Sequence, residues 1–240
     1  MNKLQDWKTT NRLLDQLPDD VCERVGPHLQ RVPLVAGKVL YESSAQQSHI
    51  YFPRTGVVSL LYVMDDGVTG EIAMVGNEGA VGIAVLVDSM ATPTRAEVQI
   101  DGEAWMLKSE MIDAEFKRGG PFQLILLRYT QLMLSQMAQA VICNRHHSVE
   151  KQLCRWLLLA CDRAHSERLQ LTQEAISNLL GVRREAISEA ASRLQDAKLI
   201  SYSRGNIQLL DRDGLEARSC GCYQAVRDEQ ARMMKSLREL

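Results

Sequence analysis

Three charged side chains stand together at Arg183, Arg184 and Glu185, directly after Gly181 and Val182. An arginine can donate two hydrogen bonds to guanine, and a glutamate can accept one from the amino group of cytosine. Such side chains reach base edges when they project from a helix that enters the major groove. The chemistry open to this cluster is therefore recognition of DNA bases, provided that the chain places it at the start of such a helix.

The segment from Leu171 to Ile200 predicts two helices joined by a tight turn at Gly181. Thr172 is a suitable N-cap for the first helix, and Gly181 can adopt the left-handed backbone that turns the chain. A helix-turn-helix presents the first residues of its second helix to the bases. An ordinary helical hairpin is the alternative, but the spacing of small, glycine and aliphatic residues favours a helix-turn-helix.

A short hairpin is expected after the second helix. Residues 199–210 form two apolar runs around Arg204-Gly205-Asn206, a composition typical of a hairpin turn. In this place the hairpin would be the wing of a winged helix. Arg204 at its tip could contact a phosphate and fix the register without reading sequence. The alternative for Arg204 is a solvated turn residue.

The composition is that of a globular protein of 240 residues, with 45% hydrophobic and 24% charged residues. The net charge of −2 does not favour a nucleic-acid partner, although residues 145–213 hold eleven Lys or Arg against nine Asp or Glu. No N-terminal apolar run resembles a signal peptide, and the apolar stretch at 124–134 is too short to cross a bilayer. We therefore expect a cytoplasmic protein without membrane contact.

The first half of the chain has the pattern of a β-domain. Between residues 32 and 107, short runs rich in Val, Ile and Leu are separated by glycines. This spacing favours an antiparallel sandwich or jelly roll. A helix is expected before it, at residues 19–29, after the break at Pro18.

A long helix is expected from Pro121 to about Asn144. Apolar residues recur along this helix at alternating steps of three and four, which is the spacing of a coiled-coil seam. The one polar residue of the row, Gln131, could fix the register. The expected dimer seam is Leu124, Leu127, Gln131, Leu134, Ala138 and Val141. A second apolar stripe would pack on the sheet, which leaves the seam for a second copy of the chain. A single buried helix in a monomer is the alternative.

The order of jelly roll, long helix and winged helix resembles the cyclic-AMP receptor and fumarate-nitrate regulator (Crp/Fnr) family of bacterial transcription factors. Residues 181–188 are similar to the family's recognition helix, and residues 76–82 (Gly-Asn-Glu-Gly-Ala-Val-Gly) to the segment lining its effector pocket. The resemblance implies an α+β fold with a cyclic-nucleotide-binding-like jelly roll at 1–120, a dimerisation helix at 121–145, a winged helix-turn-helix at 146–225 and a C-terminal tail at 226–240. Within that tail, residues 227–240 are expected to be an exposed amphipathic helix.

The resemblance also implies roles for individual residues. The expected DNA contacts are Thr172, Arg183, Arg184, Glu185, Ser188, Glu189 and Arg204. The expected effector pocket is lined by Gly79, Ala80, Val81, Gly82, Thr94 and Arg95. Glu189 departs from the family pattern, which has arginine there, so we do not expect the family's usual operator. The expected partners are double-stranded DNA, a second copy of the chain and, by resemblance alone, RNA polymerase.

Cyclic AMP is not the expected effector. Family members that bind it carry a glutamate where this chain has Ala80, and an Arg-Ser pair where it has Thr94 and Arg95. The side chains that would bind the ribose and the phosphate are therefore both missing, although Arg95 could still bind an anion. We expect another small molecule as the effector, if the pocket is occupied at all.

The cysteines do not predict a cofactor. Oxygen-sensing family members hold an iron–sulfur cluster near the N-terminus, which needs about four converging thiolates, but only Cys22 lies there. Cys143, Cys154 and Cys161 have a spacing that places them on similar helix faces, and we expect them to be buried structural thiols.

The Cys220-Gly-Cys222 pair could bind metal or form a redox pair, but this spacing alone is a weak signal. A haem would need an axial ligand, and His146 and His147 are expected to be solvated at the domain hinge. No metal site and no cofactor are therefore expected.

A metal-dependent cupin enzyme is the enzymatic alternative for a jelly roll. Such an enzyme needs clustered histidine and carboxylate ligands, but the sheet half holds only His49, with His28 just before it. We find no nucleophile elbow, phosphate-binding loop or pair of catalytic carboxylates, so no enzymatic activity is expected. The remaining alternative is an effector-binding module whose winged helix contacts a partner protein.

Overall fold

Two long antiparallel strands form the centre of the N-terminal half in the computed structural model, which describes residues 10–87 and 92–239. β3 (His49–Val63) and β5 (Thr94–Lys108) pair from end to end, and register shifts near Gly56 interrupt the ladder. The outer strands are β4 (Thr69–Val75), which pairs with β3, and β1 (Gln30–Leu34) and β2 (Val39–Tyr41), which pair with β5. This sheet confirms the expected N-terminal β-domain.

Short helices flank the sheet. They are η1 (Leu14–Gln16), α1 (Asp19–Val25), η2 (Gly26–His28), η3 (Ile83–Val87) and α2 (Ser109–Arg118). The helix expected over residues 19–29 ends at Val25 and continues as a 3-10 turn, because Pro27 has no backbone N–H to continue the α-helical hydrogen bonds.

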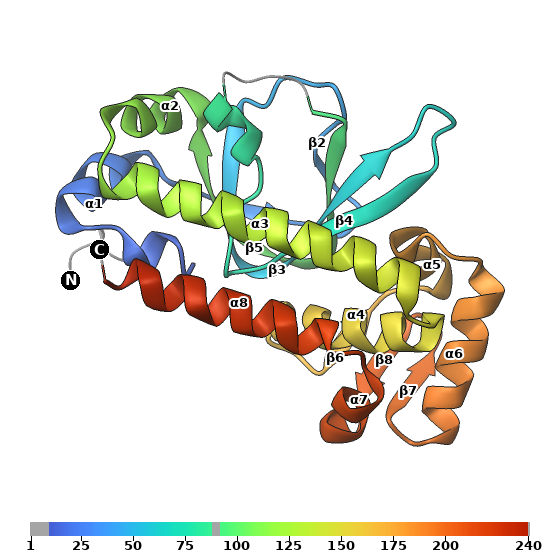
Figure 1. The fold of residues 1–240 in the computed structure, drawn as a ribbon. Coiled ribbons are helices and arrows are strands. Elements are labelled where there is room, and N and C mark those ends of the chain that lie inside the picture. The colour runs from blue at the N-terminus through green and yellow to red at the C-terminus, as the bar shows by residue number, and fades with distance from the viewer. Residues whose placement is uncertain (1–9, 88–91, 240) are drawn as a thin grey trace.

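The helix α3 (Pro121–His146) crosses the sheet and begins at the expected proline (Figure 1). Its inner face contributes large side chains to the N-terminal core, among them Phe122, Tyr129 and Leu132. The helix has 26 residues, yet neither it nor any other helix in the described residues combines the length and apolarity needed to span a membrane.

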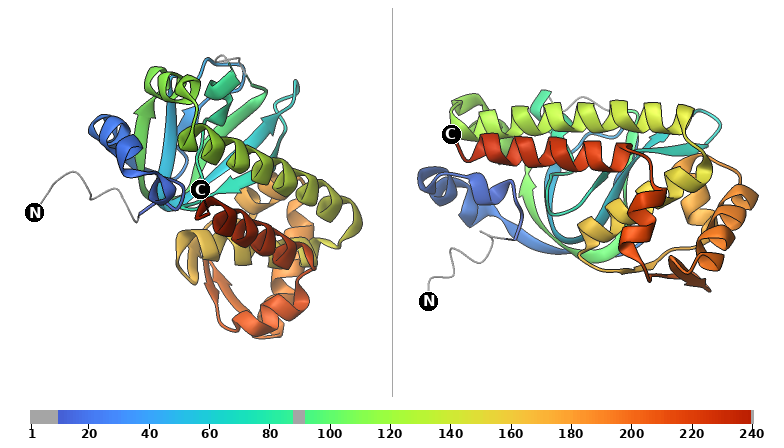
Figure 2. Two further views of the ribbon diagram at one scale, coloured as in Figure 1. Left: turned by 60° about the vertical axis from the view of Figure 1, so that its left-hand side comes forward. Right: turned by 60° about the horizontal axis from the view of Figure 1, so that its bottom comes forward.

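The C-terminal segment is an amphipathic helix, as expected, but it is not wholly exposed, because its apolar face is buried. The helix α8 (Cys222–Leu237) runs beside α3 back towards the N-terminal half (Figure 2). Met233, Met234 and Leu237 are buried in the same core as the inner face of α3. The apolar stripe that indicated an amphipathic helix is therefore covered by the rest of the chain.

The C-terminal half combines helices with a small antiparallel sheet. Its helices are α4 (Val149–Ala164), α5 (Gln173–Leu180), α6 (Arg184–Asp196) and α7 (Arg212–Arg218), and its strands are β6 (Arg168–Gln170), β7 (Ile200–Ser203) and β8 (Asn206–Leu209). The strands lie in the order β6-β8-β7, so the β7–β8 hairpin directly follows α6. This arrangement confirms the expected helix-turn-helix and its wing.

The two halves share a continuous apolar contact. Val57, Leu61 and Met74 of the sheet are buried in the same cluster as Trp156 and Leu159 of α4. Apolar burial of this kind contributes roughly 25 cal/mol per Å² of surface removed from water. The C-terminal half is therefore docked against the β-domain of its own chain.

Candidate nucleic-acid interface and effector site

The two helices of the helix-turn-helix begin and end as the sequence predicts. The Thr172 hydroxyl caps α5 by accepting a hydrogen bond from the amide of Ala175 at 3.1 Å. Gly181 ends α5 with a φ of +65°, a conformation that favours glycine. α6 then starts with Arg184, so that Arg183 is its N-cap residue and Glu185 lies in its first turn.

The helix α6 divides into a buried face and an exposed face. Ile187, Ala190, Ala191 and Leu194 are buried against α4 and α5. The side chains of Arg183, Arg184 and Glu185 are exposed and make no ion pair or hydrogen bond with the residues that the structure describes. Their charges are therefore available to an external partner.

Besides the capping residue Thr172, two further expected DNA contacts are engaged within the chain. The Ser188 hydroxyl donates a hydrogen bond to Oε1 of Gln173 at 2.6 Å, which ties α6 to the first turn of α5. The Glu189 carboxylate lies 3.7 Å from Arg193, which also pairs with Glu150 at 3.3 Å. Gln173 is a residue that the sequence analysis did not single out, and only the crossing of the two helices brings it to Ser188.

The hairpin tip is held in place relative to the two helices. Arg204 and Gly205 have φ values of +49° and +79°, and both positive angles are what a two-residue type I′ turn requires. The amide of Leu171 donates to the carbonyl oxygen of Gly205 at 2.7 Å, and the Tyr202 hydroxyl donates to the carbonyl oxygen of Leu171 at 2.8 Å. Arg204 is therefore exposed on a wing that is fastened to the start of α5.

The expected dimer seam lies on the outer face of α3. All six of its residues, Leu124, Leu127, Gln131, Leu134, Ala138 and Val141, are at least partly exposed in the single chain. Leu134 and Val141 expose 63% and 65% of their area, although they are large and apolar. Such a row of exposed apolar side chains marks a surface for association.

The segment from Gly79 to Gly82 is packed against α3. The Tyr129 hydroxyl donates a hydrogen bond to the carbonyl oxygen of Ala80 at 3.0 Å, and Ala80 and Val81 are buried. A Cβ at position 79 would lie 2.3 Å from that hydroxyl oxygen, so only glycine fits there. Any movement of this segment would therefore have to displace Tyr129 and with it α3.

Thr94 and Arg95, the other residues of the expected pocket, offer a ligand less positive charge than the sequence implies. Nε of Arg95 lies 2.7 Å from a carboxylate oxygen of Glu42, so this arginine is already paired. The Thr94 hydroxyl forms a hydrogen bond with that of Thr92 at 2.9 Å. Arg95 therefore does not offer an unopposed positive charge to a phosphate.

A buried glutamine that the sequence analysis did not single out lies close to both Gly82 and Thr92. Gln47 is 3% exposed and donates through Nε2 to the Thr92 hydroxyl at 3.4 Å. Its Oε1 has no hydrogen-bond partner among the described residues and would lie 3.6 Å from a Cβ at position 82. Unpaired buried polar atoms are rare, so this oxygen is a candidate acceptor for a ligand.

A buried ion pair connects the segment at residues 76–82, which was expected to line an effector pocket, to the C-terminal half of the chain. Nε of Arg163 in α4 lies 2.6 Å from Oε1 of Glu78, and each side chain is only 5% exposed. Nη2 of the same arginine donates to Oε1 of Gln136 in α3 at 3.3 Å. Arg163 is therefore the place where the β-domain, the long helix and the C-terminal half meet.

A second carboxyl at this junction, that of the half-buried Glu71, makes stability depend on pH. Trp156 donates to Oε1 of Glu71 at 2.9 Å and Ser59 donates to Oε2, and enclosure of the carboxyl raises its pKa. A raised pKa stabilises the fold at low pH, and this contribution is lost as the pH rises through the raised value. Glu71→Gln keeps both partners but cannot ionise. We expect the unfolding free energy of the parent, measured with urea, to fall relative to that of the variant from about pH 4 upwards. A difference that is constant with pH would contradict this assignment.

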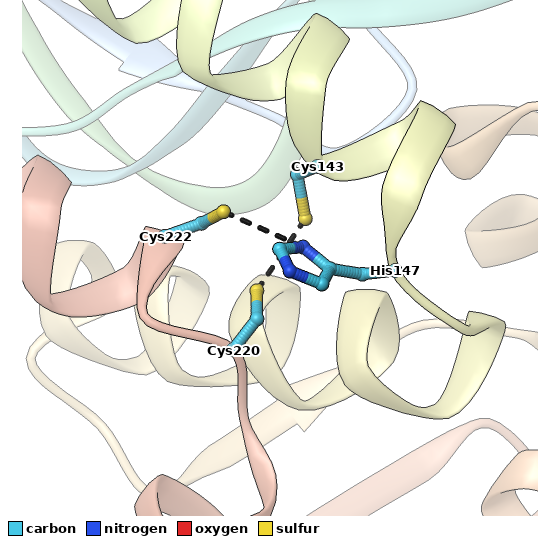
Figure 3. Close-up of side chains that lie close together, drawn as sticks. All are labelled: Cys143, His147, Cys220 and Cys222. Carbon is cyan, nitrogen blue, oxygen red and sulfur yellow. Dashed lines mark hydrogen bonds between the residues drawn. The ribbon is translucent and has the colours of Figure 1, made fainter.

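The cysteines are arranged differently from the sequence expectation. Cys154 and Cys161 are buried in the C-terminal core, as expected. Cys143 is not grouped with them but forms a separate buried cluster with Cys220 and Cys222. His147, which was expected to be solvated, is half-buried, and its Nδ1 lies 3.5 Å from Sγ of Cys222 (Figure 3). The sequence did not place Cys143 and His147 beside Cys220 and Cys222, because their approach depends on the path of α8.

Comparison with known proteins gives one family match and many similar structures. The sequence model of the Crp-like helix-turn-helix domain matches residues 151–218. Comparison with curated proteins finds no significant relative. A chain from Eubacterium rectale assigned to the Crp/Fnr family of transcriptional regulators has a TM-score of 0.69 at 19% identity, over 86% of this chain and 96% of its own.

Two further structures have the same fold. FixK2 from Bradyrhizobium japonicum has a TM-score of 0.68 at 18% identity, over 80% of this chain and 98% of its own. The c-di-GMP-responsive global regulator CLP from Xanthomonas campestris has a TM-score of 0.65 at 16% identity, over 80% of this chain and 99% of its own. The shared fold therefore extends from the β-domain through α3 to the wing.

Proposed function

We propose that this chain is a DNA-binding transcriptional regulator of the Crp/Fnr type that binds a two-fold symmetric operator as a homodimer, as the Crp-like helix-turn-helix match and the shared fold support. The same proposal assigns the chain a regulatory rather than an enzymatic role. Contact with RNA polymerase and action in the cytoplasm, where bacterial DNA lies, belong to the same proposal. They are supported by the resemblance to that family alone.

The exposed first turn of α6 is the observation that carries the proposal. Arg184 is available for a bidentate contact to O6 and N7 of guanine, and Glu185 for a hydrogen bond from N4 of cytosine. Arg204 on the fastened wing is available for a phosphate, which would fix the position of α6 on the duplex. Ser188 and Glu189 would first have to exchange their contacts within the chain for contacts to DNA.

The outer face of α3 supports a second copy of the chain as the partner. A two-fold interface uses the same surface on both copies, and the seam from Leu124 to Val141 has the spacing that two packed helices require. The opposite face of α3 is buried in its own chain and is not available. A dimer of this kind could present two α6 helices to half-sites about one DNA turn apart.

Two arginine variants separate base recognition from backbone contact. Arg184→Ala should cost about 1–3 kcal/mol at one base pair of each half-site and relax the preference there. Arg204→Ala should weaken binding to all sequences about equally and lower the salt dependence by about one unit for each phosphate that is no longer bound. Competition between operators with single base changes, at several salt concentrations, measures both effects. Identical behaviour of the two variants would contradict the division of roles.

The effector, we infer, is not cyclic AMP. Ala80 cannot accept a hydrogen bond from a ribose hydroxyl through its side chain, and Arg95 is already paired with Glu42. Titration calorimetry with cyclic AMP should therefore give no heat of binding at micromolar concentrations, whereas micromolar affinity would overturn the inference. For a different small molecule in the β-domain, Oε1 of Gln47 is the buried acceptor positioned to receive a donor.

A further inference from the structure

Three cysteines and one histidine converge where α3 ends and α8 begins (Figure 3). Cys143 lies in the last turn of α3 and His147 directly after it, while Cys220 and Cys222 stand at the start of α8. Three Sγ atoms and one ring nitrogen lie within 4.8 Å of one another. We propose that these four residues bind one thiophilic divalent cation, with zinc as the expected ion.

The separations between the ligand atoms fit a single tetrahedral ion. Zinc binds cysteine sulfur at about 2.3 Å and histidine nitrogen at about 2.0–2.1 Å, so neighbouring ligand atoms lie roughly 3.5–3.8 Å apart. Sγ of Cys143 and Sγ of Cys220 are 3.5 Å apart, as are Sγ of Cys222 and Nδ1 of His147. Little movement is needed for all four atoms to reach one ion.

The same spacing disfavours other uses of these thiols. The four ligands of an iron–sulfur cluster are divided among two or more iron atoms and must surround the inorganic core, which leaves ligands of different irons farther apart than here. A disulfide requires sulfur atoms about 2.0 Å apart, and all of these cysteines are free thiols in the structure. Hard cations such as magnesium and calcium prefer oxygen ligands, of which the group has none. Three thiolates and one imidazole are a donor set of structural zinc sites.

The surroundings supply a hydrogen bond and a compensating charge. Nε2 of Gln139 donates to Sγ of Cys222 at 2.9 Å, the kind of contact that orients a metal ligand. Arg155 is only 8% exposed, its Nε has no hydrogen-bond partner among the described residues, and its charge acts on Cys143. A divalent ion with three thiolates carries one net negative charge, which the buried guanidinium would balance.

The position of the site gives it a structural consequence. Cys143 belongs to α3, His147 lies in the short connection to α4, and Cys220 and Cys222 lie where α7 passes into α8. One ion bound by all four would cross-link these three segments. It would thereby fix the end of the long helix relative to the helix-turn-helix domain. This consequence does not depend on which DNA sequence the protein binds.

Cobalt provides a spectroscopic test on the full-length protein. The chain is stripped of metal by a chelator under reducing conditions and then titrated with Co²⁺. We expect one Co²⁺ per chain, with the charge-transfer bands of bound thiolates and the strong visible absorption of a tetrahedral ion. Zn²⁺ should displace the cobalt and remove both signals, since comparable sites bind zinc more tightly.

Three variants locate the signal. Cys222→Ser should abolish the tetrahedral spectrum. Gln139→Leu keeps all four ligands and should weaken Co²⁺ affinity by roughly 10–100-fold. Cys22→Ser removes a half-buried thiol of α1 outside the group and should leave both spectrum and affinity unchanged. Gln139→Leu still tests the site if Cys222→Ser does not fold.

Two results would overturn the proposal. One is a folded, fully reduced parent protein that shows no tetrahedral Co²⁺ spectrum at any ratio. The other is an unchanged spectrum in a folded Cys222→Ser variant together with unchanged affinity in Gln139→Leu. Either result would show that the four side chains are neighbours only.

Discussion

Leu134→Glu should convert the proposed dimer into monomers and remove most of its affinity for the operator. Leu134 is 63% exposed near the middle of the seam on α3, so the substitution does not disturb the core of a single chain. In the dimer, each copy would place an unpaired carboxylate in an apolar interface, which is strongly unfavourable. We expect operator affinity to fall by about 10²–10⁴-fold, because two linked half-sites become independent. Sedimentation and a binding titration measure the two effects.

Gln123→Glu is the matched control for this experiment. It adds the same charge to the same helix, one position before the seam begins. We expect this variant to remain dimeric and to bind the operator as tightly as the parent. A Leu134→Glu protein that also stays dimeric and keeps its affinity would show that the two copies meet elsewhere.

Glu78→Gln should destabilise the protein by about 3–5 kcal/mol. The variant leaves the Arg163 guanidinium buried without its carboxylate partner at 2.6 Å, and the remaining contact to Gln136 does not carry a charge. A urea titration of the unfolding free energy measures the loss. We expect the double variant Glu78→Gln/Arg163→Met to lose less than Glu78→Gln alone, because it removes the unpaired charge as well.

An exposed ion pair provides the comparison. Lys117 and Asp113 lie 2.8 Å apart in α2 with side chains that are 72% and 43% exposed. Asp113→Ala should change the unfolding free energy by less than about 1 kcal/mol. If Glu78→Gln lowered the unfolding free energy no more than Asp113→Ala, the Glu78–Arg163 pair would not hold the segment at residues 76–82 against the C-terminal half.

The features that the sequence predicted well are those set by neighbouring residues. The cap at Thr172, the turn at Gly181 and the wing tip at Arg204 each depend on a few adjacent side chains and backbone angles. The periodicity of α3 likewise separates a buried face from an exposed seam within one helix. Local physical rules are enough to place the helix-turn-helix and its charged first turn.

The features that the sequence did not predict depend on distant segments. The burial of Met233 and Met234 follows from the return of α8 along α3, which no local pattern specifies. The same return brings Cys220 and Cys222 to Cys143, a residue more than seventy positions earlier. A Cys-x-x-x-His spacing at the end of α3 and the Cys-x-Cys pair were both visible, but only the fold joins them. The sequence likewise did not predict the unpaired Oε1 of Gln47, since its environment comes from separate segments of the β-domain.

Sequence-specific DNA binding by a dimer can be measured in a single selection experiment. The purified protein is used to select binding sites from a pool of random-sequence DNA duplexes. We predict enrichment of one two-fold symmetric sequence with half-sites about one helical turn apart. Uniform, salt-sensitive binding with no enriched sequence would contradict recognition of base edges by the first turn of α6.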